Sequence, residues 1–270
     1  MKAASAIGIA AAIIGLLVGA TMEGTQVPSF LNIPAMLIVF PGTLGATLAS
    51  TSMEAIKSIP MLYKKAFSAE RPDLSAQLEL LVGFAERARR EGLLALDEVV
   101  ADIDDEFTKK GLQLVVDGTD PDLVREILEN ELDGMAARHH AMAAPFEKAG
   151  GFAPTLGIIG TVMGLVHVLQ NLSAPATLGP AISGAFIATL YGVASANLVF
   201  LPIANKLKGM SAEEAELRTM TLEGILSIQA GDNPRVVADK LLSFIPPAER
   251  AQDEAKEPAG VEAEPELAAA

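Results

Sequence analysis

Four long stretches of this chain contain no Asp, Glu, Lys or Arg, and they limit strongly what the chain can fold into. They cover residues 3–22, 30–50, 151–172 and 180–204. A helix needs about 20 predominantly apolar residues to cross a bilayer, and each stretch reaches that length. Because lipid offers no hydrogen bonds, a backbone inside it must be helical or part of a closed barrel. We therefore predict an all-α integral membrane protein with four transmembrane helices and a helical cytoplasmic domain.

The first stretch has a rival interpretation. Lys2 followed by an apolar run and small residues also suits a secretory signal peptide. The second apolar stretch follows at once, however, and a helical hairpin accounts for both. Pro34 and Pro41 interrupt this second stretch, and prolines survive in a membrane where protein or water satisfies the freed carbonyl groups. We expect the second helix to be packed against protein or kinked.

The charged residues gather outside the apolar stretches. Half of the chain is hydrophobic, whereas its formal net charge is −14, and this segregation is typical of membrane helices joined to a water-exposed domain. The acidic balance argues against a nucleic-acid partner, whose phosphates need clustered Lys and Arg. The absence of cysteine excludes disulfides and thiolate metal sites.

The same segregation divides the chain into five predicted parts. They are transmembrane helices 1 and 2 (1–50), a cytoplasmic helical domain (51–150), transmembrane helices 3 and 4 (151–205), a second cytoplasmic helical region (206–245) and a disordered acidic tail (246–270). Basic residues mark the cytoplasmic ends of membrane helices. They follow the second and fourth stretches and precede the third, namely Lys57, Lys64, Lys65, Arg71, Lys148, Lys206 and Lys208. We therefore expect a multi-pass inner-membrane protein with both termini and the large loop in the cytoplasm.

A helix is predicted to begin at Asp120-Pro121-Asp122. Asp120 can cap the helix, Pro121 suits its first position, and Asp122 complements the helix dipole. Apolar residues at helical spacing follow and lead almost directly into the third membrane stretch. Movement in the membrane could therefore reach the cytoplasmic domain. Pro145 is a candidate for a kink along the way.

The third and fourth stretches form a hairpin that contains hydroxyl groups but no carboxylate. Its threonines include Thr155, Thr161 and Thr189, which are candidates for an ion path. The alternative is that such hydroxyls bond a carbonyl one helical turn earlier, as is common in membrane helices. His167 lies near the outer end of the third stretch, where an interfacial role is favoured over proton relay. Small residues at four-residue spacing could pack these helices together or receive helices of other chains.

Two prolines share one depth at the cytoplasmic ends of this hairpin. Pro154 could be a first-turn proline. Pro202, late in the fourth stretch, must break a backbone hydrogen bond and is expected to kink its helix. Together they are predicted to form a hinge at the boundary between membrane and cytoplasm.

The charged segments contain no clear site for chemistry. The run of acids that begins at Asp102 lacks the turn glycine and the closing glutamate of a calcium loop, because Phe107 and Gln113 stand there. A mixed-charge patch around Arg89 and Asp97 would ordinarily serve surface solubility. No nucleotide loop or hydrolase motif occurs, so we expect neither an enzyme nor a bound cofactor or metal.

Three segments carry a resemblance to the MotA family of flagellar stator subunits. They read GGFAPTLGIIGTVMGLVHVL, SGAFIATLYGVASANLVFLPIANKL and DGTDPDLVREILENEL. The resemblance extends to about residue 245 and includes the two-plus-two arrangement of membrane helices. The related energisers ExbB and TolQ resemble only the last two stretches, and an ExbB/TolQ-like energiser of another envelope process is the alternative.

The resemblance implies a motor subunit for motility and chemotaxis. Five copies would surround two copies of a single-span MotB-type partner, which supplies an ion-binding aspartate, and proton or sodium flow would drive the rotor protein FliG. Thr189 matches the family's ion-path threonine. At the position of Thr161, sodium-type stators tend to carry Thr and proton-type ones Ala, so this residue slightly favours sodium. Arg89 and Asp97 match the family's rotor-binding pair, with Asp97 one methylene shorter than the usual glutamate.

Two further classes of protein remain open on the residues alone. A self-contained small channel or transporter should carry its own ionisable group inside the membrane, and His167 is the single candidate there. A structural membrane protein with a helical scaffold would predict no dependence of function on Thr189 or Pro202.

Overall fold

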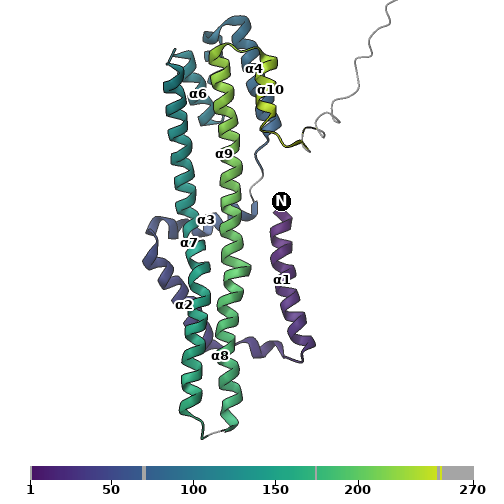
Figure 1. The fold of residues 1–270 in the computed structure, drawn as a ribbon, viewed down its shortest axis with the longest axis vertical. Coiled ribbons are helices and arrows are strands. Elements are labelled where there is room, and N and C mark those ends of the chain that lie inside the picture. Colours follow the sequence, from purple (N-terminus) through teal and green to yellow (C-terminus); the bar gives the residue numbers. More distant parts are fainter. Residues whose placement is uncertain (1, 69–70, 174, 248–249, 251–270) are drawn as a thin grey trace, which may run out of the picture. The chain divides into compact units, whose positions relative to one another are not determined.

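The computed structural model describes residues 2–68, 71–173, 175–247 and 250, and these residues form helices and no strand (Figure 1). In chain order the elements are α1 (Lys2–Met22), η1 (Val27–Phe30), α2 (Ile33–Ser50), α3 (Met53–Ser68), α4 (Leu74–Glu91), η2 (Leu93–Leu96), α5 (Asp97–Val100), α6 (Glu106–Val116), α7 (Pro121–Gln170), α8 (Pro175–Ser195), η3 (Ala196–Phe200), α9 (Leu201–Ala230) and α10 (Pro234–Leu242). The chain divides into a first unit (Met1–Arg71 with Asp133–Glu213) and a second unit (Pro72–Leu132 with Glu214–Ala270). The expected all-α class is confirmed.

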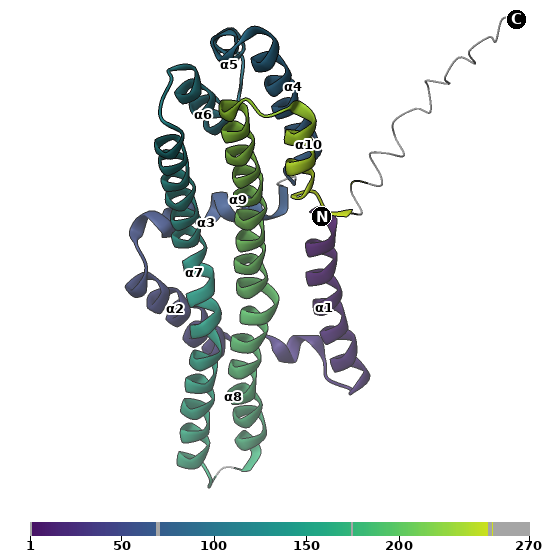
Figure 2. The ribbon, with the colours of Figure 1, turned by 45° about the horizontal axis from the view of Figure 1, so that its top comes forward.

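In the first unit, the later part of α7 and α8 run side by side and antiparallel (Figures 1 and 2). Helix α2 packs against α8 through a small core that includes Val39 and Ala188. Tyr191 of α8 donates its hydroxyl proton to the carbonyl of Phe30 and accepts a hydrogen bond from the Asn32 backbone. A partly buried polar link of this kind helps to fix the register between the two membrane-type helices.

Helix α3 crosses α7 and α9 instead of running alongside them (Figure 1). It buries Leu62 and Ala66 against Phe146 of α7 and Ile203 of α9. Its opposite side is exposed and carries Lys57 and Lys64. The helix is therefore amphipathic, with an apolar side against protein and a basic outer side.

The second unit has a single large hydrophobic core. Leu81 of α4, Phe107 of α6, Leu128 of α7 and Ile225 of α9 are all buried in it. Helix α10 closes this core with Leu241, whose side chain is fully buried. The hydrophobic effect stabilises such a core only where water surrounds the fold, so the second unit is built like a water-exposed domain.

The helix beginnings follow local rules read from the sequence. Helix α7 begins at Pro121, and the Asp120 carboxylate accepts a hydrogen bond from the Asp122 backbone at 3.0 Å, so the predicted start is confirmed. Pro34 lies in the first turn of α2 and does not interrupt it, because Asn32 caps this helix from outside. Pro41 alone lies in its interior.

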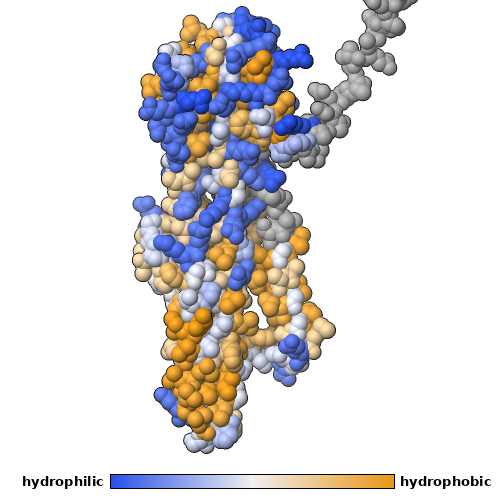
Figure 3. Space-filling model, viewed as in Figure 1, coloured by the Kyte–Doolittle hydropathy of each residue, from blue (hydrophilic) through white to orange (hydrophobic). Residues whose placement is uncertain are grey.

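Within the part of the chain that the structure describes, three helical runs are long and apolar enough to cross a membrane: Ile33–Ser50, Pro121–Gln170 and Pro175–Ala230. Helix α1 contains a shorter apolar run, Ile7–Met22. Hydrophobic side chains cover the surface of the α7–α8 hairpin (Figure 3), where Ile158, Val162 and Phe186 are exposed. Such a surface is costly in water and suits lipid or a partner helix.

Candidate functional site

The α7–α8 hairpin owes its close approach to residues without bulky side chains. A Cβ atom added to Gly157 would lie 2.8 Å from the Ala188 carbonyl oxygen, and one added to Gly164 would lie 2.6 Å from the Ala185 Cβ. Neither position has room for a methyl group. The small residues of this hairpin therefore pack within the chain, as one of the two sequence interpretations proposed.

The close approach brings Thr161 of α7 and Thr189 of α8 together. Their hydroxyl oxygens are 2.5 Å apart. The Thr161 hydroxyl also lies 3.1 Å from the carbonyl oxygen of Gly157 and 2.9 Å from that of Ala185. The Thr189 hydroxyl lies 3.4 Å from the Gly157 oxygen. Each threonine thus reaches a carbonyl of the opposite helix, so simple bonding within one helix does not describe them.

This group can hold or pass a positive charge but cannot carry a proton on an acid. Two hydroxyls have two protons to donate, and four oxygens compete for them. Both threonines are half-buried. Neutral oxygens that converge in this way suit an alkali cation or a water chain. Across the described residues, no group of three or more His, Cys, Asp or Glu is placed to bind a metal ion.

Thr155 does not join the pair. Its side chain is exposed on α7, and its hydroxyl donates to the Phe152 carbonyl at 2.7 Å. It therefore follows the local bonding pattern that sequence reasoning offered as the alternative. His167 is also exposed, and its ring nitrogen and carbonyl oxygen lie near the Asn171 amide.

The two prolines differ in their local structure. Pro154 lies inside α7, so the first-turn interpretation is wrong. The helix that precedes it continues into the membrane stretch without a new start. A Cβ atom added to Gly150, one turn earlier, would lie 2.7 Å from the Leu201 Cγ. Ala153, next to Pro154, lies beside Gly192 instead, since a Cβ atom added to Gly192 would lie 2.4 Å from the Ala153 carbonyl oxygen. Gly150, and not Pro154, is thus level with the start of α9.

Pro202 follows a π-helical turn, η3. The Leu201 backbone N–H bonds the Ala196 carbonyl, five residues back. Proline has no N–H to offer the Leu198 carbonyl and its ring would crowd that group, and a wider turn relieves both problems. Periodicity does not reveal such a turn, because the apolar pattern continues through it.

The charged pair Arg89 and Asp97 lies where α4 ends. Arg89 is exposed in the last turn of α4, and Asp97 is exposed in the first turn of α5. Gly92 between them has φ 89° and ends α4, with its N–H on the Ala88 carbonyl at 2.8 Å. This left-handed backbone favours glycine. Neither charge forms an ion pair with another described residue.

The ion pairs of this patch instead belong to Arg87. It contacts Glu98 at 2.8 Å and Glu91 at 3.2 Å. The first contact ties α4 to α5 and holds the patch in shape. Sequence reasoning identified the mixed-charge patch but not the ion pairs within it. The four-residue spacing to Glu91 was the available signal.

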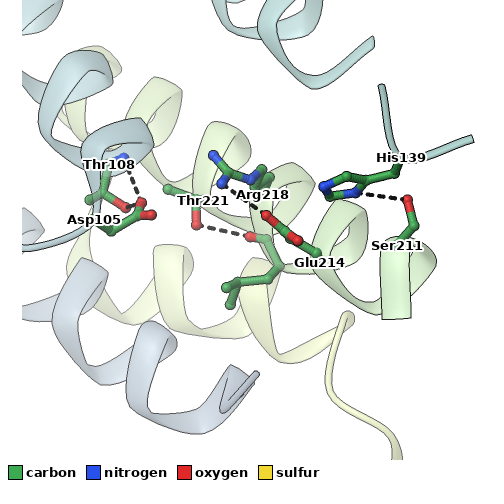
Figure 4. A network of polar contacts seen from close by, with 8 residues as sticks. Asp105, Thr108, His139, Ser211, Glu214, Arg218 and Thr221 are labelled. Carbon is green, nitrogen blue, oxygen red and sulfur yellow. Dashed lines mark hydrogen bonds and ion pairs between the residues drawn. The ribbon is translucent and has the colours of Figure 1, made fainter. Parts of the chain in front are cut away.

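Two polar clusters in the second unit were not expected from the sequence. The Gln77 amide donates to the buried hydroxyls of Thr108 and Thr221, at 3.2 and 2.9 Å. Asp105 accepts from the Thr108 backbone and hydroxyl at 2.8 and 2.7 Å (Figure 4). The acid run that fails as a calcium loop thus supplies a helix cap.

The second cluster surrounds Glu223 of α9. Its carboxylate contacts Arg125 of α7 at 3.0 Å and Lys240 of α10 at 2.7 Å. Burial opposes ionisation of Glu223, but hydrogen bonds from Lys240 and Arg125 outweigh this and lower its pKa below the ordinary value. The same hydrogen bond from Arg125 to Glu223, opposed by burial, raises the pKa of Arg125.

Known proteins resemble this chain over almost its full length. The model of the MotA/TolQ/ExbB proton channel family matches residues 99–220. Motility protein A of Bacillus subtilis (strain 168) is 39% identical over 251 residues, which cover 93% of this chain and 93% of that protein. Motility protein A of Borreliella burgdorferi is 39% identical over 252 residues, with 93% and 97% covered.

Two solved structures share the fold. The flagellar MotAB stator complex from Bacillus subtilis contains a chain with a TM-score of 0.86 and 38% identity, which covers 93% of this chain and 98% of that one. The C. jejuni MotAB structure contains a chain with a TM-score of 0.86 and 30% identity, with 91% and 96% covered. The likeness therefore includes both units.

Proposed function

This chain belongs to the MotA/TolQ/ExbB proton channel family, among the motility A proteins, and we propose that it is a stator subunit of the bacterial flagellar motor. With a MotB-type partner it forms a transmembrane path for protons or sodium ions and converts ion flow into torque on the rotor protein FliG. The observation that carries this proposal is the likeness to a chain of a MotAB stator complex over 93% of this chain. Relatives of full length favour it over an ExbB/TolQ-like role.

The hydroxyl pair is one wall of the ion path in this proposal. Thr161 and Thr189 offer neutral oxygens to a passing ion, and the partner's single span supplies the carboxylate that the hairpin lacks. The exposed position of Thr155 on α7 suits a residue that completes the path only when a partner helix covers it. Ion passage by exchange among several weak oxygen ligands needs no tight site.

The hinge in this proposal is formed by Pro154 and Pro202, near the cytoplasmic ends of the two helices of the hairpin. π-helical turns occur mostly as single turns at functional sites, and helices often kink at them. The η3 turn directly precedes Pro202. Ion binding at the threonine pair would change the packing of α7 and α8, and the hinge would pass that change along α9.

Contact with the rotor is assigned to Arg89 and Asp97. Both are exposed and unpaired among the described residues, while Arg87 and Glu98 hold the patch together. Opposite charges on the rotor can therefore engage them without breaking an internal ion pair. Such contacts guide association more than they add affinity.

Assembly and topology complete the proposal. We infer a homo-pentamer around two partner spans, four transmembrane helices, and both termini with the large loop in the cytoplasm. The inner-membrane location itself follows from the channel family and the apolar helices. The five parts expected from the sequence remain predictions. The two compact units do not test their limits, because each unit combines two segments that are distant in the sequence.

Deletion of the gene tests the function. We expect flagella to assemble but not to rotate, and plasmid expression of this chain to restore swimming only when the partner is present. Flagella that still rotate at normal speed would contradict a stator role. Loss of the flagella themselves would point to a structural role instead.

A further inference from the structure

A cavity of about 310 Å³ lies within the first unit, between α1, the end of α3 and the start of α9. Gly8 of α1, Phe67 of α3, and Pro202 and Ile203 of α9 contribute to its walls. Its volume lies within the range of small-molecule sites, well beyond the space of a few water molecules. Nothing in the proposed motor cycle uses this space.

The lining is apolar with one basic end. Of its ten lining residues, eight are apolar, and the two polar ones are Asn197 and Lys206. No lining residue is acidic. The Asn197 amide already donates to the Val193 carbonyl at 2.9 Å. A ligand that fits must therefore be mostly hydrocarbon with an anionic group that can reach an ammonium.

The surrounding surface adds positive charge. Lys64 and Lys65 directly precede the two α3 residues that line the cavity, and both are exposed. Neither forms an ion pair with another described residue. The cytoplasmic leaflet carries anionic lipids, and basic pockets between membrane helices on that side bind their headgroups.

We propose that this cavity binds an anionic phospholipid of the cytoplasmic leaflet, with acyl chain carbons along the apolar walls and the phosphodiester at Lys206. The proposal rests on the proposed function for the side of the membrane on which the cavity opens. Pro202 forms part of the wall, so the lipid occupies space into which the hinge region would otherwise collapse. The four apolar stretches of a second copy of this chain contain no Asp or Glu, so they offer Lys206 no anionic group, whereas the phosphodiester of a lipid does.

The test uses the full-length chain purified with its co-expressed partner and then depleted of lipid. Native mass spectrometry measures how many molecules of dioleoyl phosphatidylglycerol, compared with dioleoyl phosphatidylcholine, each subunit retains. We expect several-fold preference for phosphatidylglycerol in the natural protein. Lys206→Gln should abolish the preference while it leaves phosphatidylcholine retention unchanged, because the apolar walls remain.

Filling the cavity gives a second, independent variant. Gly8→Leu should reduce retention of both lipids, since Gly8 lines the cavity and a Cβ there meets nothing within 4 Å. Gly15→Leu is the matched control, because Gly15 lies on the same helix with equally open space but outside the lining. It should leave retention unchanged.

Three results would overturn the proposal. They are equal retention of the two lipids by the natural protein, an unchanged preference in Lys206→Gln, and competition by millimolar inorganic phosphate equal to that by lipid. Efficient cross-linking between copies through a cysteine at Ile9 would show that a neighbouring copy fills the space. Swimming assays report separately on the stator role, so failure of one proposal is distinguishable from failure of the other.

Discussion

Two hydroxyl groups decide what the hairpin can do at the scale of single residues. The hydroxyls of Thr161 and Thr189 lie within hydrogen-bond distance of each other and of carbonyl oxygens of both helices. The sequence placed both threonines in the membrane but could not tell whether they meet, because that depends on the rotation of α7 against α8. The closeness of Gly157 to Ala188 sets this rotation. Residue type was thus predictable, whereas the pair was not.

Removing one hydroxyl should slow the motor. Thr189→Val keeps the shape of the side chain but loses one hydrogen-bonding oxygen, worth about 1 kcal/mol. If that oxygen stabilises the ion in passage, transit slows about fivefold, and swimming speed at low load should fall or change its ion dependence. Tracking of swimming cells in sodium-rich and sodium-free media measures this.

Thr189→Ser is the control and should retain motility, because its hydroxyl remains. Membrane levels of both variants are compared by immunoblot. Normal swimming of Thr189→Val in every ion condition would remove Thr189 from the ion path.

Charge reversal at Arg89 should weaken rotor engagement without loss of stability. Its side chain is exposed and has no ion-pair partner among the described residues, so Arg89→Glu should change the free energy of unfolding by less than about 0.5 kcal/mol. Torque measured on tethered cells should fall. A compensating charge change on FliG should restore it, and failure of every such change would leave Arg89 as a surface residue only.

At the scale of elements, two local features explain why helical periodicity was an incomplete guide. The apolar pattern predicted the helices of α7 and α8 but placed a helix start near Pro154, where α7 continues. It also expected a kink at Pro202 but gave no sign of the π-helical turn that directly precedes this proline. A sequence pattern records which residues are apolar, and these outcomes depend on how backbone bonds rearrange around a ring.

Replacing Pro202 should reduce torque more than protein level. Alanine supplies the backbone N–H donor that the Leu198 carbonyl lacks, so the turn can revert to a regular α-helix. We expect the amount of Pro202→Ala protein in the membrane to stay close to that of the natural protein, while flagellar rotation is lost. Pro180→Ala, a change at another proline inside α8, should affect neither. Equal losses of level and rotation would indicate misfolding.

Acid should weaken the link among α7, α9 and α10. The pKa of Glu223 is lowered from its ordinary value of about 4.5, so its contribution is complete above that pH and is lost as pH falls through the lower, folded-state pKa. Glu223→Gln should cost about 1–3 kcal/mol at neutral pH, and the difference from the natural protein should vanish in acid. Thermal unfolding followed by helical circular dichroism measures it.

Glu129→Gln provides the comparison for this change. Glu129 contacts the same Arg125 at 3.6 Å, but it is more exposed than Glu223. Its loss should cost less than about 0.5 kcal/mol. A Glu223→Gln deficit that persists unchanged at low pH would show that the carboxylate charge is not the cause.

At the scale of the whole molecule, charge segregation predicted the all-α class, which is confirmed. Among the described residues, three helical runs are long and apolar enough to cross a membrane, so the expected number of four remains a prediction. Charge segregation could not predict that α7 and α9 each contribute to both compact units. Nor could it find the Gln77 bonds to Thr108 and Thr221, whose partners are distant in sequence. Long-range polar contacts have no periodic signature, so they become visible only in the fold.

The absence of cysteine allows a direct test of topology. Single cysteines at two exposed positions, Glu23→Cys and Asp104→Cys, should react with an impermeant maleimide on opposite sides of the membrane. We expect labelling at position 23 in intact cells and at position 104 only after permeabilisation. The reverse pattern would invert the proposed orientation.

The π-helical turn at Ala196–Phe200 has a consequence for how the length of this family's chains can vary. A π turn holds one residue more than the α-turn that it replaces. Loss of one residue there would yield a regular helix while the buried face of α9, with Met220 and Ile225, kept its direction. Loss of one residue elsewhere in the same run would rotate that face by about 100°. Single-residue gaps between aligned relatives should therefore fall at this turn. A residue can be gained or lost there without a change in the packing of the second unit.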